Sequence, residues 1–172
     1  NGRVTTPITN APDFFANLTS MGSGCLQGCI GLISPKFPKL LTMGPVSFYL
    51  CTNLVNPEFP LLTSAGYQAF GSCSSLVNPD FSSLEIVGDA CFGRCTSYTN
   101  INLPSCTALG ATSGVDPYDN VFVDIINLTI TLTIPCALNS DGDVLYLTDL
   151  VQGNIVTIIN SDGPCSTTTT TT

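Results

Sequence analysis

The nine cysteines are the residues of this chain with the greatest capacity for chemistry. Thiolates bind zinc, attack electrophiles and form disulfide bonds. Two pairs, Cys25 with Cys29 and Cys91 with Cys95, have the spacing of a loose zinc site, but such a site needs further cysteine or histidine ligands. The chain has no histidine, so it lacks the commonest metal ligand and the commonest general base.

Other catalytic and metal-binding patterns are absent from the sequence. It contains neither the Gly-x-Ser-x-Gly turn of serine hydrolases nor the Gly-x-x-x-x-Gly-Lys phosphate loop. Asp141 and Asp143 flank a glycine, and Asp116 and Asp119 lie close together, but neither group is followed by the last glutamate of a calcium loop. Both groups are interpreted as turns. The sequence therefore predicts no enzyme, no metal and no cofactor.

The cysteines belong to a repeat with a period of 22 residues, which places six columns of residues in one register. The columns are Gly22, Gly44, Gly66, Gly88 and Gly110; Cys29, Cys51, Cys73 and Cys95; Phe15, Phe37, Phe59, Phe81 and Leu103; Leu18, Leu40, Leu62 and Leu84; Leu26, Phe48, Phe70 and Phe92; and Leu32, Leu54, Leu76 and Tyr98. Internal repetition of this kind predicts a solenoid, in which each coil buries its apolar side chains against the next.

One coil, residues 70–88, shows how the repeat is expected to fold. Phe70, Cys73 and Leu76 recur at intervals of three and predict a short helical or 3₁₀ turn. Residues 78–81 alternate apolar and polar side chains, which predicts a short strand. The chain then turns back, and Gly88 is placed at a corner where we expect a positive φ angle.

The polar positions of the predicted strands form an outward strand face. Glu58 and Asp80 lie on adjacent coils and are expected about 5 Å apart, since that is the spacing of neighbouring strands. This separation is like that of a glycosidase pair, but the repeat produces it without any catalytic requirement. We regard the strand face as a candidate binding surface, made of Ser34, Lys36, Asn56, Glu58, Asn78, Asp80, Asn100 and Asn102.

The repeat resembles the BspA-like (Treponema-type) leucine-rich repeats of bacterial surface proteins, which read approximately as Ala-Phe-x-x-Cys-x-x-Leu-x-x-Ile-x-Leu-Pro. The segments Gln68-Ala69-Phe70-Gly71-Ser72-Cys73-Ser74-Ser75-Leu76 and Ile101-Asn102-Leu103-Pro104 match this pattern, and the resemblance covers about residues 4–110. Pro35, Pro57 and Pro79 replace the usual isoleucine. Because proline lacks an N–H donor, we expect the strand pairing to be short and partly broken there.

The fold class expected is an α/β-type repeat solenoid, a short stack of about five 22-residue coils with a β-rich C-terminal cap. We divide it into a degenerate N-terminal coil or cap (1–25), repeat coils (26–110), the cap (111–166) and a threonine-rich tail or linker (167–172). The segment 131–135 echoes 100–104 and is interpreted as a last, displaced coil. Residues 154–159 are expected to form the final strand.

The repeat also explains most of the thiols. Cys29, Cys51, Cys73 and Cys95 are interpreted as a structural ladder of buried thiols, because cysteine packs as a small hydrophobic residue. Cys25 and Cys91 share the column of Ala69, which accounts for the zinc-like spacing. Outside the ladder, Cys106, Cys136 and Cys165 are candidates for a disulfide bond, with Cys106–Cys136 the preferred pair. The odd count leaves at least one thiol free or paired between chains.

Composition excludes several classes of partner. Four basic residues against twelve acidic ones give a net charge of −8, the opposite of a nucleic-acid-binding footprint. The mean hydropathy of +0.37 is high, but Pro, Gly, Asn and Ser interrupt every apolar stretch, so no membrane insertion is expected. The start of the chain lacks a basic segment followed by an apolar one, and Asn1 is interpreted as a mature or trimmed terminus.

The favoured function is an extracellular or virion-surface structural or adhesive protein that assembles with itself into a filament or fibre. The alternative is a module that recognises a host-surface glycan or protein on the strand face. Two sequons, at Asn17 and Asn127, and the tail allow glycosylation in such a location. The candidate acceptors in the tail are Thr167, Thr168, Thr169, Thr170, Thr171 and Thr172.

Overall fold

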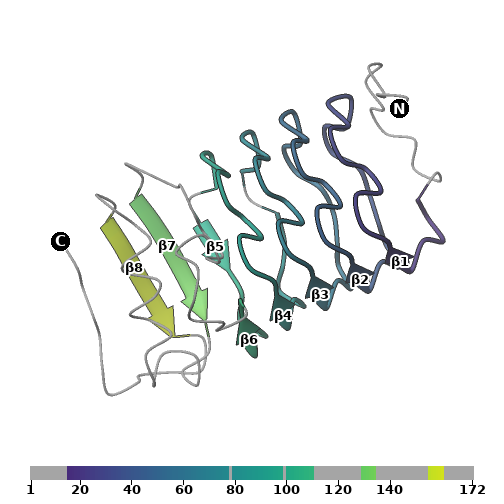
Figure 1. Ribbon diagram of the computed structural model, residues 1–172. Coiled ribbons are helices and arrows are strands. Elements are labelled where there is room, and N and C mark those ends of the chain that lie inside the picture. The colour runs from purple at the N-terminus through teal and green to yellow at the C-terminus, as the bar shows by residue number, and fades with distance from the viewer. Residues whose placement is uncertain (1–14, 78, 99, 111–128, 135–154, 161–172) are drawn as a thin grey trace.

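The computed structural model describes residues 15–77, 79–98, 100–110, 129–134 and 155–160. Between residues 15 and 110 the chain winds into successive coils that lie in a row, as Figure 1 shows. The described part of the chain contains short strands and turns and no helix. The solenoid predicted from the period is therefore confirmed, with turns in place of the helical element of the repeat.

One parallel sheet runs along the lower edge of the coils in Figure 1. It is formed by β1 (Ser20–Met21), β2 (Thr42–Met43), β3 (Ser64–Ala65), β4 (Ile86–Val87) and β6 (Ala108–Leu109). Each strand pairs with the one exactly one period later, for example Met21 with Met43. The sequence pattern assigned this segment to the return of the chain, so these short strands were not predicted.

The predicted strand at residues 78–81 exists mainly as isolated parallel bridges. Lys36 pairs with Glu58, and Glu58 pairs with Asp80, with the buried prolines beside them. Where Ile101 replaces proline, the same position forms a regular strand, β5 (Asn100–Asn102). This contrast confirms the expected effect of the prolines, since each removes one donor from the ladder.

β5 continues into a second parallel sheet with β7 (Thr129–Ile134) and β8 (Ile155–Asn160). Ile101 pairs with Leu132, and Leu132 pairs with Ile158. The register pairs residues 131–133 with 100–102, the two segments whose sequences echo each other. The final strand expected at 154–159 is β8, shifted by one residue.

The opposite side of each coil is made of successive turns. Within these turns Cys73 N–H bonds the carbonyl of Phe70 and Leu76 N–H bonds that of Cys73, which are the i→i+3 bonds expected from the spacing. They do not continue into a helix, because two residues of each coil have positive φ angles, such as Gln68 at 48° and Ser72 at 60°. Other N–H groups on this turn side donate to the next coil.

The glycine column is explained by close contact between backbones. Gly88 does not have the positive φ angle that the sequence suggested, although Gly110 does, at 64°. A Cβ atom added to Gly88 would lie 2.5 Å from the carbonyl carbon of Gly66 and 2.6 Å from the amide nitrogen of Tyr67. One added to Gly44 would lie 2.9 Å from the carbonyl carbon of Gly22. Glycine therefore recurs because adjacent coils leave no room for a side chain.

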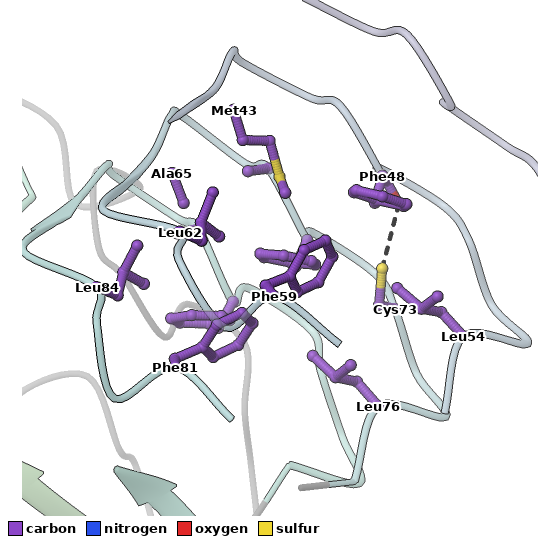
Figure 2. Packing of buried hydrophobic residues seen from close by; sticks show 14 of the residues in the cluster. Met43, Phe48, Leu54, Phe59, Leu62, Ala65, Cys73, Leu76, Phe81 and Leu84 are labelled. Carbon is purple, nitrogen blue, oxygen red and sulfur yellow. Dashed lines mark hydrogen bonds between the residues drawn. The ribbon is translucent and has the colours of Figure 1, made fainter. Parts of the chain in front are cut away.

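The core is a pair of aromatic stacks that run along the solenoid (Figure 2). One stack contains Phe15, Phe37, Phe59 and Phe81, and the other contains Phe48, Phe70 and Phe92, with centroids of successive rings 4.4–6.0 Å apart. Rings of the two stacks also touch edge to face, as in Phe48 with Phe59. Leucine and cysteine ladders fill the remaining interior.

Candidate binding surface

The strand face displays charged side chains from three consecutive coils. Lys36, Glu58 and Asp80 follow one another along the isolated bridges and are all exposed. The Nζ atom of Lys36 lies 2.7 Å from Oε1 of Glu58, with both side chains more than half exposed. The Oδ1 atom of Asp80 accepts a hydrogen bond from the N–H of Ser82. One salt bridge at this exposure contributes little stability, at most about 1 kcal/mol, so these groups are available to a ligand.

The remaining predicted residues of this face lie at the neighbouring positions. Asn56, Asn100 and Asn102 are exposed, and Ser34 is half-buried. Asn78 lies outside the described residues. The described residues of this face thus occupy two neighbouring columns of the repeat, whereas their role in binding stays a prediction.

A column of apolar side chains near the charged residues in the chain is not predicted from the sequence. Ile33, Val55 and Val77 occupy one 22-residue column and are half-buried or exposed. Their backbones are joined directly, because Val55 N–H bonds the carbonyl of Ile33 at 2.7 Å and Val77 N–H bonds that of Val55 at 3.1 Å. The signal was present as a column of β-branched residues directly before the predicted strand. An apolar column thus precedes the charged row by three residues in each of these coils.

The two carboxylates do not form an acid–base site. Glu58 and Asp80 lie on adjacent coils as predicted, but both are exposed, and Lys36 pairs with the carboxylate of Glu58. A glycosidase needs one carboxyl group in an environment that keeps it protonated, commonly an apolar pocket. Water surrounds both groups here, so the geometry favours surface recognition over catalysis.

The cysteine ladder is buried and bonded to the backbone. The thiols of Cys51, Cys73 and Cys95 each donate to a carbonyl 25 residues earlier in the chain, at 3.0–3.1 Å. Figure 2 shows this bond between Cys73 and Phe48. Burial raises the pKa of Cys51 and of Cys95 to about 12, and that of Cys73 well above its usual range. Buried protonated thiols of this kind are structural, as the repeat indicated, and are poor nucleophiles.

The thiols outside the ladder are only partly described. Cys91 is buried in the column next to the ladder, and burial raises its pKa well above the usual range. Cys106 is also buried, with its pKa raised to about 11 by burial, and its thiol lies 3.4 Å from the carbonyl oxygen of Ala108. Its suggested partner Cys136 and the candidate Cys165 lie outside the described residues, so the disulfide bond stays a prediction. Among the described residues, no group of three or more potential ligands is placed to hold a metal ion.

Native thiol labelling tests the structural interpretation. Among the described cysteines, iodoacetamide at pH 8 should modify the exposed Cys25 within minutes and the ladder thiols only after denaturation. Because the raised pKa values favour the protonated form in the folded state, the contribution of these thiols to the free energy of unfolding should be constant below about pH 8.5 and fall at higher pH. Mass spectrometry after digestion measures the labelling, and urea titrations at pH 7 and pH 10 measure the stability. Fast native labelling of Cys73 would contradict the interpretation.

The candidate glycosylation sites are also partly described. Asn17 is exposed, and its Oδ1 atom accepts a hydrogen bond from Lys39 Nζ at 2.8 Å. Thr19 of the same sequon is exposed as well, while Leu18 packs against the core. Asn127 and the tail 167–172 lie outside the described residues. In the parts of the chain that are described, no helix has the length and apolar character to cross a bilayer.

Comparison with known proteins identifies the family of the repeat. The sequence model of the BspA-type leucine-rich-repeat region matches residues 9–114 in six copies. A crystal structure of a leucine-rich-repeat protein of T. pallidum is similar, with a TM-score of 0.54 and 19% sequence identity. The similarity covers 83% of this chain and 63% of that one, so the chain spans less than two thirds of its length. No curated protein matches the sequence significantly.

Proposed function

Because this chain belongs to the family of BspA-type leucine-rich-repeat proteins, we propose that it is a non-catalytic adhesive scaffold that works outside a cell or on a virion surface. The repeat scaffold of this family is often used for protein interaction and is generally non-catalytic. Proteins of the BspA type are commonly associated with surfaces, which supports the location. The strand face is the surface by which we propose that the scaffold binds.

The observation that carries this proposal is the separation of the two kinds of functional group. Burial raises the pKa of the buried thiols Cys51, Cys73, Cys91 and Cys95. In contrast, the charged row of Lys36, Glu58 and Asp80 is exposed. A scaffold of this kind offers an ordered row of hydrogen-bonding groups at a spacing of about 5 Å. Such an arrangement fits recognition better than catalysis.

A protein surface is the ligand that the strand face fits best. The column of Ile33, Val55 and Val77, half-buried or exposed, precedes the charged row by three residues in the chain. It offers apolar contact area together with polar groups, which is the usual make-up of a protein interface. Sugar rings pack well on aromatic side chains, and the exposed large apolar side chains of the described residues include one aromatic, Tyr67, which is outside this face. A glycan is therefore the less favoured ligand.

Adhesion measurements test this function. The full chain should bind one or more purified extracellular-matrix proteins in surface plasmon resonance, and a double variant Glu58→Lys, Asp80→Lys should lose at least tenfold in affinity. The control is Ser74→Lys, Thr96→Lys, which places two lysines on the turn side and changes the net charge by +2, against +4 in the strand-face variant. Equal binding by both double variants would contradict the strand-face proposal. Binding to a glycan array with loss in the same variant would select the glycan instead.

Self-assembly into a fibre is a second candidate, favoured by the end of the second sheet. Within the described residues, β8 pairs on one side with β7 and has no second neighbour. A strand with an unpaired edge is a template for pairing with another chain. Electron microscopy of the purified chain tests this candidate, which predicts filaments that lengthen with concentration; particles of uniform size would contradict it.

A further inference from the structure

The outer side of the sheet β1–β2–β3–β4–β6 is a second surface, separate from the strand face. Three columns of residues line it, and small polar side chains are their commonest type. The columns are Asn17, Lys39, Leu61, Ser83 and Ser105; Thr19, Leu41, Thr63, Glu85 and Thr107; and Ser20, Thr42, Ser64, Ile86 and Ala108. The repeat therefore shows which residue type is usual in each column, and residues of another type stand out.

Three departures are large apolar residues on consecutive coils. Leu41, Leu61 and Ile86 have exposed fractions of 44%, 48% and 51%. All three lie around Thr63: its N–H bonds the carbonyl of Leu41, its carbonyl accepts the N–H of Ile86, and Leu61 precedes it by two residues. These three exposed residues surround one backbone position and are together called here the outer-sheet patch. Contiguous exposed apolar groups of this kind mark interaction sites on soluble proteins.

The other two departures are charges of opposite sign on either side of the patch. Lys39 lies on the coil of Leu41, and Glu85 lies on the coil of Ile86. Both are exposed, and neither forms an ion pair with another described residue. Lys39 donates one hydrogen bond, to the side chain of Asn17. The patch thus has a positive end and a negative end, two coils apart.

We propose that the outer-sheet patch binds a second copy of this chain in a twofold-symmetric dimer. A twofold axis near Thr63 brings the coil of Lys39 over the coil of Glu85 in the second copy, and the reverse pair forms by symmetry. The two unpaired charges then neutralise each other twice, Leu61 faces Leu61 of the second copy, and Leu41 of each copy lies over the coil of Ile86 of the other. This self-complementarity is what an isologous interface requires, and it is independent of the strand-face ligand.

The dimer is expected to be weak. Three apolar side chains cover less than the roughly 800 Å² per partner of a standard interface. The net charge of −8 on each copy also opposes association at low ionic strength. We therefore expect a dissociation constant in the micromolar to millimolar range.

Sedimentation velocity of the full chain over a concentration series, with reductant to exclude disulfide links, tests the proposal. The outer-sheet contact should appear as a monomer-to-dimer equilibrium, whereas contacts of the fibre candidate would add larger species. Leu61→Ser with Ile86→Ser, which restore the small polar type of the two columns, should weaken the dimer at least tenfold. Leu50→Asn is the matched control, because it removes an equally exposed leucine from a turn at a φ angle of 62° that asparagine tolerates. A wild-type monomer at millimolar concentration, or equal dimerisation by all variants, would overturn the proposal.

Charge exchange tests the orientation of the two copies. Lys39→Glu and Glu85→Lys should each weaken the dimer, since each places like charges opposite one another in both symmetry-related pairs. The double variant Lys39→Glu, Glu85→Lys restores opposite charges and should regain the wild-type dissociation constant. Failure of the double variant to recover would overturn the twofold arrangement. Circular dichroism of each variant establishes that the fold is intact.

Discussion

Replacing Phe70 with alanine should lower the free energy of unfolding by about 3–5 kcal/mol, the usual cost of removing a fully buried aromatic ring. Phe70 has no exposed surface and contacts rings of both stacks. The ring centroids of Phe48, Phe59, Phe81 and Phe92 lie 5.6, 5.5, 5.1 and 5.7 Å from its own. The rings on both sides are held by their own coils and cannot collapse into the space. Urea unfolding followed by circular dichroism measures the change.

Two further variants test whether the loss of stability in Phe70→Ala comes from packing in the core. Phe70→Leu should cost clearly less, because leucine keeps most of the apolar volume and already occupies the same column as Leu26. Tyr67→Ala removes an aromatic ring that is 45% exposed and should change the stability by less than about 1 kcal/mol. Equal losses for Phe70→Ala and Tyr67→Ala would show that the two stacks are not the core of the solenoid.

Alanine substitutions at different positions of the glycine column should change the free energy of unfolding by different amounts. Gly88→Ala should destabilise the chain by about 1–3 kcal/mol or more, because its Cβ would lie 2.5 Å from the backbone of Gly66. Relief would require the two coils to separate, since the obstructing atoms belong to the main chain. Gly22→Ala is the matched control: among the residues that the structure describes, no atom lies within 4 Å of its added Cβ, and its φ angle is not in the left-handed region.

The control should be neutral or stabilising by up to about 1 kcal/mol, because alanine reduces the freedom of the unfolded chain. Thermal and urea unfolding of both variants measure the difference between the two sites. Similar losses at Gly22 and Gly88 would mean that glycine recurs for its backbone freedom and not for the contact between coils. The comparison is direct because the two residues hold equivalent positions of the repeat.

The period predicted most of the architecture because it reports contacts between equivalent residues. It placed Cys73 and Phe70 in the interior, the charged row outside, and residues 131–133 in register with 100–102. The effect of Pro57 and its equivalents on strand pairing followed from the missing N–H donor. These features depend on spacing and on the chemistry of single residues, which a sequence displays.

Backbone geometry was less predictable. The spacing of Phe70, Cys73 and Leu76 is common to a helix and to a series of turns, and the positive φ angle of Ser72 decides between them. Such an angle at Ser72, and at the β-branched Val46, is imposed by bonds to the next coil and not by local preference. The sequence predicts a corner at Gly88 and not its contact with Gly66, because that contact exists only once the coils are stacked. On the strand face, the charged row was predicted and the apolar row of Val55 was missed.

Backbone hydrogen bonds between coils on the turn side all point the same way along the solenoid, and this gives the turn side an electric dipole. Alternate N–H groups there donate to the following coil, as Val46 does to Tyr67, Phe48 to Ala69 and Leu50 to Gly71, and the same bonds recur in the neighbouring coils. Each peptide unit carries a dipole of about 3.5 D, and these bonds align the dipoles of successive coils. Their sum makes the C-terminal end of the turn side electropositive and its N-terminal end electronegative. Two such molecules placed end to end attract head to tail and repel head to head.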